Sequence, residues 1–142
     1  MSTELTRETM TAYLRTLVQR GAYGTYFADD VTFTLMGAGQ EVKGQAEVEQ
    51  FIRYFHEQAF DAEPLIKNTV VADGQAALEA DFVGTHTGEF LGVAATGRQV
   101  NVPYAVLYDL DDGKITALRA YIPMDVLMQQ IGATVTSAQA ES

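Results

Sequence analysis

His86 is the residue whose type and spacing best suit acid–base chemistry. It stands in strict alternation with small and apolar residues, which are Leu78, Ala80, Phe82 and Gly84. Alternate residues of a strand point to the same face, so His86 is expected to share the inner face of a sheet with them. An imidazole titrates near neutral pH and could act there as a general acid or base. The alternative is a structural histidine that fastens the turn at 87–97.

Arg119 and Tyr121 are the residues best suited to stabilise negative charge. They alternate with Ile115 on the last predicted strand, which places all three on one face. A buried guanidinium beside a phenol could hold a substrate carboxylate or a developing enolate oxygen. Because a buried arginine needs a partner, the alternatives are an ion pair with Glu79 or Asp81, or exposure at a dimer surface.

Asp125 is the nearest carboxylate after the last predicted strand, two residues beyond Pro123. It could serve in proton transfer or position a water molecule. The alternative role is structural, because an aspartate between a proline and a short helix commonly caps that helix.

Neither a metal nor a cofactor is expected. His56 is predicted on the solvated side of a helix, and the pair His86 and Glu89 is too sparse for a metal site. The glycine-rich segments do not join a strand to a helix, which is the setting of nucleotide-binding fingerprints. The sequence therefore predicts chemistry by side chains alone.

The elements that position these residues follow from the apolar periodicity. A period of 3 to 4 predicts helices over 5–21, 48–59 and 125–131, and a period of 2 predicts strands over 31–35, 65–71, 76–87, 98–109 and 114–122. The last four strands are joined by short turns and should form an antiparallel meander. We therefore predict an α+β fold in which a curved antiparallel sheet packs against N-terminal helices around an apolar pocket.

The expected pocket walls are apolar or aromatic. They are Tyr104, Leu35, Met36, Phe55 and Phe82, and for Tyr104 the alternative is plain sheet packing. The ligand predicted for such a pocket is a small hydrophobic molecule.

Length and charge limit the other partners. The chain of 142 residues suits one domain, predicted at 1–132, with a flexible tail at 133–142. The 19 acidic and 9 basic residues give a net charge of −10, which disfavours nucleic acid and anionic membranes. The absence of cysteine fits a reducing compartment, and the polar N-terminal residues contain no signal segment, so a cytoplasmic protein is expected.

Three segments in the middle and later parts of the chain form a recognisable set: Gly84-Thr85-His86-Thr87-Gly88-Glu89-Phe90-Leu91-Gly92, Thr96-Gly97-Arg98 and Asp112-Gly113-Lys114-Ile115. Together they resemble the SnoaL-like polyketide cyclase family of the NTF2-like superfamily. The resemblance spans roughly residues 27–132. It implies a cone-shaped α+β fold, dimers, and a deep pocket for ring-forming, isomerising, hydrating or hydrolytic chemistry on hydrophobic substrates.

The acids that the resemblance implies are absent. Cyclases of the family place an acid/base Asp just after the last strand, where this chain has Pro123. The related ketosteroid isomerases carry their base after the first strand, where this chain reads Thr34-Leu35-Met36. The epoxide hydrolases place an Asp after an Arg on the last strand, but here Ala120 follows Arg119.

The resulting prediction is a cofactor-independent cyclase or isomerase of the lyase type. His86 would carry the proton, and Arg119 with Tyr121 would stabilise an oxyanion. The alternatives are a non-catalytic small-molecule binding protein and a hydrolase or hydratase in which Asp125 positions water.

A homodimer is also predicted. Apolar residues expected on the outer face of the sheet would form its interface, and they are Leu107, Leu118, Ala120 and Ile122.

Overall fold

The computed structural model describes residues 2–132, so the predicted tail at 133–142 lies outside the described residues. In chain order the elements are α1 (Thr3–Val18), a 3-10 turn (Tyr23–Tyr26), β1 (Phe27–Leu35), β2 (Gln40–Lys43), α2 (Gln45–Arg53), a π-helical turn (Tyr54–Ala59), β3 (Phe60–Ala72), β4 (Gln75–His86), β5 (Gln99–Asp111), β6 (Lys114–Tyr121) and α3 (Met124–Gln130). Among the described residues, none of the helices is both long and apolar enough to cross a membrane.

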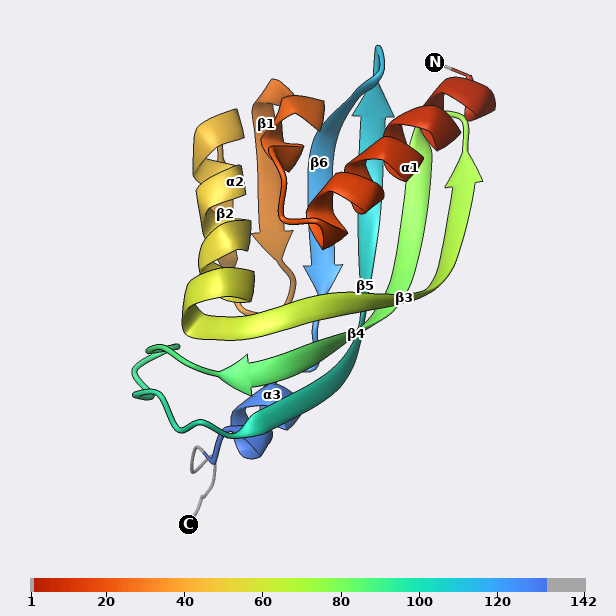
Figure 1. Cartoon of the computed structure of the whole chain (residues 1–142). Coiled ribbons are helices and arrows are strands. Elements are labelled where there is room, and N and C mark those ends of the chain that lie inside the picture. The colour runs from red at the N-terminus through yellow and green to blue at the C-terminus, as the bar shows by residue number, and fades with distance from the viewer. Residues whose placement is uncertain (1, 133–142) are drawn as a thin grey trace.

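One six-stranded sheet forms the body of the molecule, in the order β2-β1-β6-β5-β4-β3. The neighbouring strands are antiparallel except β1 and β6, which are parallel. Figure 1 shows α1 and α2 on one side of the sheet, while the long strands β3, β4 and β5 bend beneath them toward α3. The predicted α+β class and the meander β3–β6 are confirmed, and the short edge strand β2 was not predicted.

Helix α1 forms where the sequence predicts a helix, within a few residues. The Ser2 side chain caps it by accepting a hydrogen bond from the Leu5 amide at 3.0 Å. Its buried residues include Met10, Leu14 and Leu17, which recur at helical spacing. The helix ends before Arg20, whose positive φ of 58° breaks the helical path.

Strand β3 starts at Phe60, five residues before the predicted start at 65. The period of two that predicts this strand begins directly after Pro64, and proline cannot donate a hydrogen bond to a strand partner. However, β3 is an edge strand that pairs only with β4, and an edge strand tolerates proline. The strand therefore runs through Pro64 and places Phe60 and Ala62 in the core.

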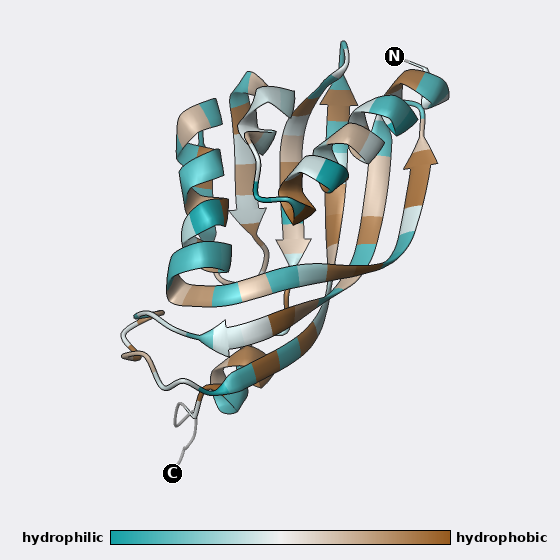
Figure 2. Ribbon diagram, viewed as in Figure 1, coloured by the Kyte–Doolittle hydropathy of each residue, from teal (hydrophilic) through white to brown (hydrophobic). Residues whose placement is uncertain are grey.

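The core consists of two clusters of buried residues. The larger lies under α1 and contains residues such as Tyr13, Phe27 and Leu118. The smaller lies near α3 and contains residues such as Phe60 and Leu127. In Figure 2 the hydrophobic segments recur along the strands, whereas α2 shows mostly hydrophilic residues. Tyr104, Ile122 and Met124 pack against both clusters and so mark the boundary between them.

A β-bulge in β6 reverses which of its side chains face inward. Asp109 of β5 pairs with Ala117 but Leu110 pairs with Ile115, so Thr116 is an extra residue on β6. Ile115 is buried, and beyond the bulge the buried residues are Leu118 and Ala120 instead of Arg119 and Tyr121. The alternation drawn from Ile115 to Tyr121 was therefore wrong, because one extra residue moves every later side chain to the other face.

Candidate functional site

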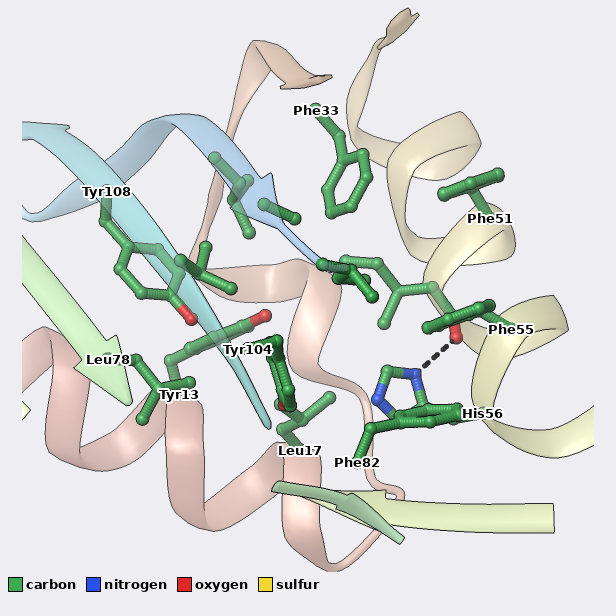
Figure 3. A pocket seen from close by; sticks show the side chains of 15 residues that line it. Tyr13, Leu17, Phe33, Phe51, Phe55, His56, Leu78, Phe82, Tyr104 and Tyr108 are labelled. Carbon is green, nitrogen blue, oxygen red and sulfur yellow. Dashed lines mark hydrogen bonds between the residues drawn. The ribbon is translucent and has the colours of Figure 1, made fainter. Parts of the chain in front are cut away.

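An apolar cavity lies between α1, α2 with its π-helical turn, and the inner face of the sheet (Figure 3). Its volume is about 50 Å³. Most lining residues are hydrophobic, namely Leu17, Phe33, Phe51, Ile52, Phe55, Leu78, Phe82, Val106, Leu118, Ala120 and Ile122. Four others carry polar atoms: Tyr13, His56, Tyr104 and Tyr108. Within the described residues, no Asp, Glu, Lys or Arg lines this cavity.

His56 presents a basic nitrogen to this cavity. Its Nδ1 lies 2.9 Å from the carbonyl oxygen of Ile52 one turn earlier, and a carbonyl can only accept, so Nδ1 carries the proton. Nε2 then holds the lone pair, and it is buried with no hydrogen-bond partner within residues 2–132. Burial lowers the pKa of His56, so the ring stays neutral near pH 7.

Three phenol groups share the cavity with His56. Tyr13 comes from α1, and Tyr104 and Tyr108 lie four residues apart on the inner face of β5. The rings of Tyr13 and Tyr108 meet edge to face with centroids 6.0 Å apart. Burial raises the pKa of each of these phenols, and repulsion raises it further, from neighbouring tyrosines for Tyr13 and Tyr108 and from Asp81 for Tyr104. All three therefore remain hydrogen-bond donors at neutral pH.

Within residues 2–132, none of these three phenol hydroxyls makes a hydrogen bond to another protein group. Phe55 and Phe82 stack beside His56, with ring centroids 4.5 Å apart, and exclude water from that side. A neutral base and several neutral donors thus line one largely apolar cavity. Such a set can remove a proton from a carbon next to a carbonyl and stabilise the resulting enolate oxygen.

His86 lies outside this cavity. It is fully buried on the inner face, as expected, but at the far end of β4, where its ring packs against Phe60 at 5.2 Å. Its Nδ1 accepts a hydrogen bond from the Thr96 amide at 3.2 Å and lies 2.9 Å from the Thr96 hydroxyl. The backbone of His86 also bonds to Gly97 and Arg98. These contacts fasten the 87–97 loop, which is the structural alternative for His86.

The other predicted catalytic residues are not brought together. Arg119 lies on the outer face and makes a paired hydrogen bond to Asp109 at 2.8 and 3.3 Å, and not to Glu79 or Asp81. Tyr121 is 43% exposed on the same outer face. Asp125 is exposed in the first turn of α3, whose N-cap is Pro123, so Asp125 is not the cap residue itself. None of the three lines the cavity.

The predicted wall residues divide into two groups. Tyr104, Phe55 and Phe82 line the cavity. Leu35 is instead buried in the larger core cluster, and Met36 donates its backbone N–H to the Ala120 carbonyl at the end of β1. Phe33 is the residue of β1 that lines the cavity, and Leu35 and Met36 follow it by two and three residues, beyond the lining.

His56 is the functional residue that the sequence prediction missed, and its expected place on the solvated surface was wrong. Glu49, Arg53 and Glu57 beside it in the sequence suggested a polar face. The signal was nevertheless present, because His56 follows Ile52 by four residues and precedes Ala59 by three. That spacing continues the apolar stripe of the helix.

The chain is similar in fold to solved structures along most of its length. A candidate SnoaL-like polyketide cyclase from Jannaschia sp. CCS1 is 23% identical, with a TM-score of 0.78 over 92% of this chain and 94% of that one. A candidate polyketide cyclase from Xanthomonas campestris pv. campestris is 18% identical, with a TM-score of 0.80 over 91% and 98%. A candidate ketosteroid isomerase from Kribbella flavida DSM 17836 is 18% identical, with a TM-score of 0.66 over 84% and 78%.

These likenesses confirm the predicted NTF2-like fold. A comparison with curated protein sequences finds none that matches this chain. The family model for SnoaL-like polyketide cyclases matches residues 8–131, which is nearly all of the described structure. The chain therefore belongs to the SnoaL-like polyketide cyclase family.

Proposed function

We propose that this protein is a cofactor-independent cyclase or isomerase, of the lyase type, for a small hydrophobic carbonyl compound. The observation that carries the proposal is the unpartnered Nε2 of His56, a residue that lines the same cavity as three phenol hydroxyls. His56 takes the place of the base that we first assigned to His86. The phenols take the oxyanion role first assigned to Arg119 and Tyr121.

The reaction follows from the protonation states in the cavity. His56 Nε2 removes a proton from the carbon next to the substrate carbonyl and becomes an imidazolium. Phenol O–H groups donate hydrogen bonds to the oxygen as it gains negative charge, in a site where water does not compete. The imidazolium then returns a proton to another atom of the enolate. Alternatively, the enolate carbon closes a ring onto a second carbonyl, whose oxygen takes the electron pair of the broken C=O π bond and then the proton from the imidazolium.

Cavity size limits the substrate. An apolar cavity of about 150 Å³ accepts benzene, whereas the one here has about 50 Å³. A compound with a six-membered ring therefore requires side chains of the lining to move, and Phe51 and Ile122 are the partly exposed apolar members able to do so. The absence of charged lining groups favours a neutral substrate.

The test is deuterium incorporation from D₂O into small ketones, with 2-butanone and cyclohexanone as probes, followed by NMR. His56→Asn keeps a donor for the Ile52 carbonyl but removes Nε2, and exchange should fall by about 10²- to 10⁴-fold. Tyr104→Phe should lower exchange by about ten-fold or more, whereas the control Tyr26→Phe, outside the cavity, should not. Equal exchange in wild type and His56→Asn would contradict the proposal.

A non-catalytic binding protein is the second candidate, favoured by the neutral and largely apolar lining. In that case the ketones would bind, as seen by chemical-shift changes, with no deuterium exchange above buffer. The hydrolase alternative has less support, because Asp125 is exposed and does not line the cavity.

The partner that we propose for the outer face of the sheet is a second copy of this chain. A row of paired residues crosses four strands there, from Val70 through Ala77 and Leu107 to Arg119. Val70 is 58% and Leu107 38% exposed, although both are apolar. Leu118, Ala120 and Ile122 face the cavity instead, so the predicted interface keeps only Leu107 from the original set.

A further inference from the structure

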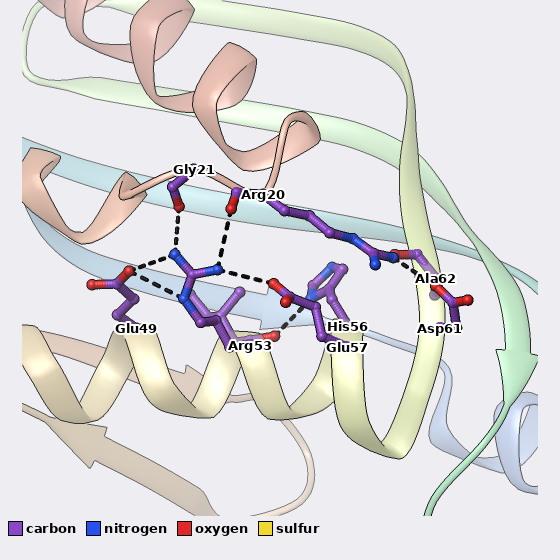
Figure 4. Close-up of polar contacts among 9 residues, drawn as sticks. Arg20, Gly21, Glu49, Arg53, His56, Glu57, Asp61 and Ala62 are labelled. Carbon is purple, nitrogen blue, oxygen red and sulfur yellow. Dashed lines mark hydrogen bonds and ion pairs between the residues drawn. The ribbon is translucent and has the colours of Figure 1, made fainter.

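His56 also lines a second, smaller cavity. This cavity has a volume of about 10 Å³, and Leu17 and His56 are shared between it and the larger one. Besides His56, its polar members are Tyr23, Arg20, Glu57 and Glu63. Glu63 is exposed, so the second cavity lies just beneath the surface. Figure 4 shows His56 between Glu57 and the Arg20 side chain that crosses above it.

A second buried polar atom without a protein partner lies in this small cavity. The hydroxyl of Tyr23 is buried and, like His56 Nε2, makes no hydrogen bond within residues 2–132. The Tyr23 ring is held in place from two sides. The Arg53 guanidinium lies 4.6 Å above its centre, and the Tyr13 ring meets it edge to face at 6.2 Å. Burial of an unpaired polar atom is costly, so two such atoms beside one cavity require a common explanation.

We propose that the small cavity binds one water molecule that bridges the Tyr23 hydroxyl and His56 Nε2. A buried site holds water when it has about 10–15 Å³ of accessible volume and two to four polar partners. This cavity meets both conditions. The residues of the two unpartnered atoms line it, and so do two charged residues, Arg20 and Glu57. Tyr23 donates to the water, and the water donates to the lone pair of Nε2.

Two charged groups that line the site, Arg20 and Glu57, are already engaged in ion pairs. Arg20 bonds to the Asp61 carboxylate at 2.8 Å and to the Ala62 carbonyl at 3.1 Å. Glu57 bonds to Arg53 at 3.0 Å, and Arg53 also donates to the Gly21 carbonyl and to Glu49. Within residues 2–132 no carboxylate makes a hydrogen bond to His56, which leaves the water as the link between the ring and the surface.

The bridging water gives His56 a path for its proton, and this part rests on the proposed function. Nε2 has one lone pair, so the water's hydrogen bond to it opens while His56 takes a proton from the substrate. Once the substrate carbon has moved away, the Nε2–H bond breaks, the electron pair stays on the nitrogen, and the proton passes to the water. The water releases one of its own protons to solvent beside Glu63. The proton that His56 removes from the substrate therefore exchanges with solvent protons. Tyr23 is a positioning residue, because it holds the water.

The water itself is tested without any substrate. A crystal structure at high resolution should show one water within 3.2 Å of both Tyr23 Oη and His56 Nε2. Nitrogen-15 NMR should show that Tyr23→Phe shifts the Nε2 resonance of His56, while Tyr26→Phe in the same 3-10 turn does not. His86 serves as the internal reference. A small cavity without water density, together with an unchanged Nε2 resonance in Tyr23→Phe, would overturn the proposal.

Exchange kinetics separate this inference from the proposed function. With cyclohexanone in D₂O, Tyr23→Phe should slow deuterium incorporation by about ten-fold and should leave the affinity for the ketone unchanged. If the water is present and His56→Asn has no effect on exchange, the proposed function fails while the water site stands. If His56→Asn abolishes exchange and Tyr23→Phe does not alter it, the proton path is wrong while the proposed function stands.

Discussion

The lowered pKa of His56 predicts how stability should depend on pH. In the folded chain, burial holds the pKa of this imidazole below its ordinary value of 6.5. The unfolded chain therefore binds a proton that the folded chain does not, at every pH between the folded pKa and about 6.5. Since protons favour the state that binds them, wild-type stability should fall as the pH drops through this window. The loss ends below the folded pKa, where both states are protonated.

The size of the effect has an upper limit. If the folded ring stays wholly neutral, an unfolded pKa of 6.5 gives a loss of about 1.4 kcal/mol between pH 7.5 and 5.5. His56→Asn has no such group. The difference in unfolding free energy, wild type minus His56→Asn, should then fall by up to about 1.4 kcal/mol over this range. All other titrating groups occur in both proteins and cancel.

Urea denaturation followed by circular dichroism at pH 5.5, 6.5 and 7.5 measures this difference. Protein concentration is kept constant, because dimer formation would otherwise change the apparent stability. A Leu17→Ala variant, which alters the same cavity wall without removing a titrating group, is the control and should show a constant difference from wild type. A constant difference for His56→Asn, or one that grows toward low pH, would show that the ring is not held neutral by burial.

Three further predictions follow from the placement of the other residues. His86→Ala should lower the unfolding free energy by about 3 kcal/mol, because it removes a buried ring and its bonds to Thr96, and thermal denaturation measures the loss. Asp125→Asn should change the unfolding free energy by less than about 0.5 kcal/mol and leave deuterium exchange of the ketone intact, since Asp125 is exposed and outside the lining. A hundred-fold loss of exchange would instead identify Asp125 as a catalytic residue. Leu107→Lys should convert the expected dimer to monomer in sedimentation, and a monomeric wild type at micromolar concentration would contradict the dimer.

The helices and the long strands were predictable because their apolar periods are strong. Packing of Met10, Leu14 and Leu17 on one face of α1 needs no information from distant residues. The edges of the sheet were less predictable. β2 has only four residues, three of them exposed, so its sequence contains no apolar alternation to find. Its pairing with β1 comes from the turn at 36–39 instead.

The sequence could not predict which side chains of β6 point toward the cavity, because their direction depends on a β-bulge. Alternation places Arg119 with Ile115, and only the extra Thr116 moves Arg119 to the outer face. The Thr116 hydroxyl bonds to the Asp109 carbonyl, and Asp109 in turn holds Arg119, so the bulge is fixed by contacts across two strands. A candidate site built on a single period therefore included two residues of this strand, Arg119 and Tyr121, that face away from the cavity.

The proposed replacement of a carboxylate base by His56 agrees with the neutral character of the cavity. An aspartate base would have to remain charged in an apolar site, and the phenols would then be needed as its hydrogen-bond donors. A neutral imidazole needs no counterion, and the burial that lowers its pKa also keeps its Nε2 lone pair available. Tyr13, Tyr104 and Tyr108 are consequently free to donate to a substrate carbonyl. The proline at position 123 is thus compatible with proton-transfer chemistry in this fold, provided that the base comes from the π-helical turn after α2 instead of from the end of β6.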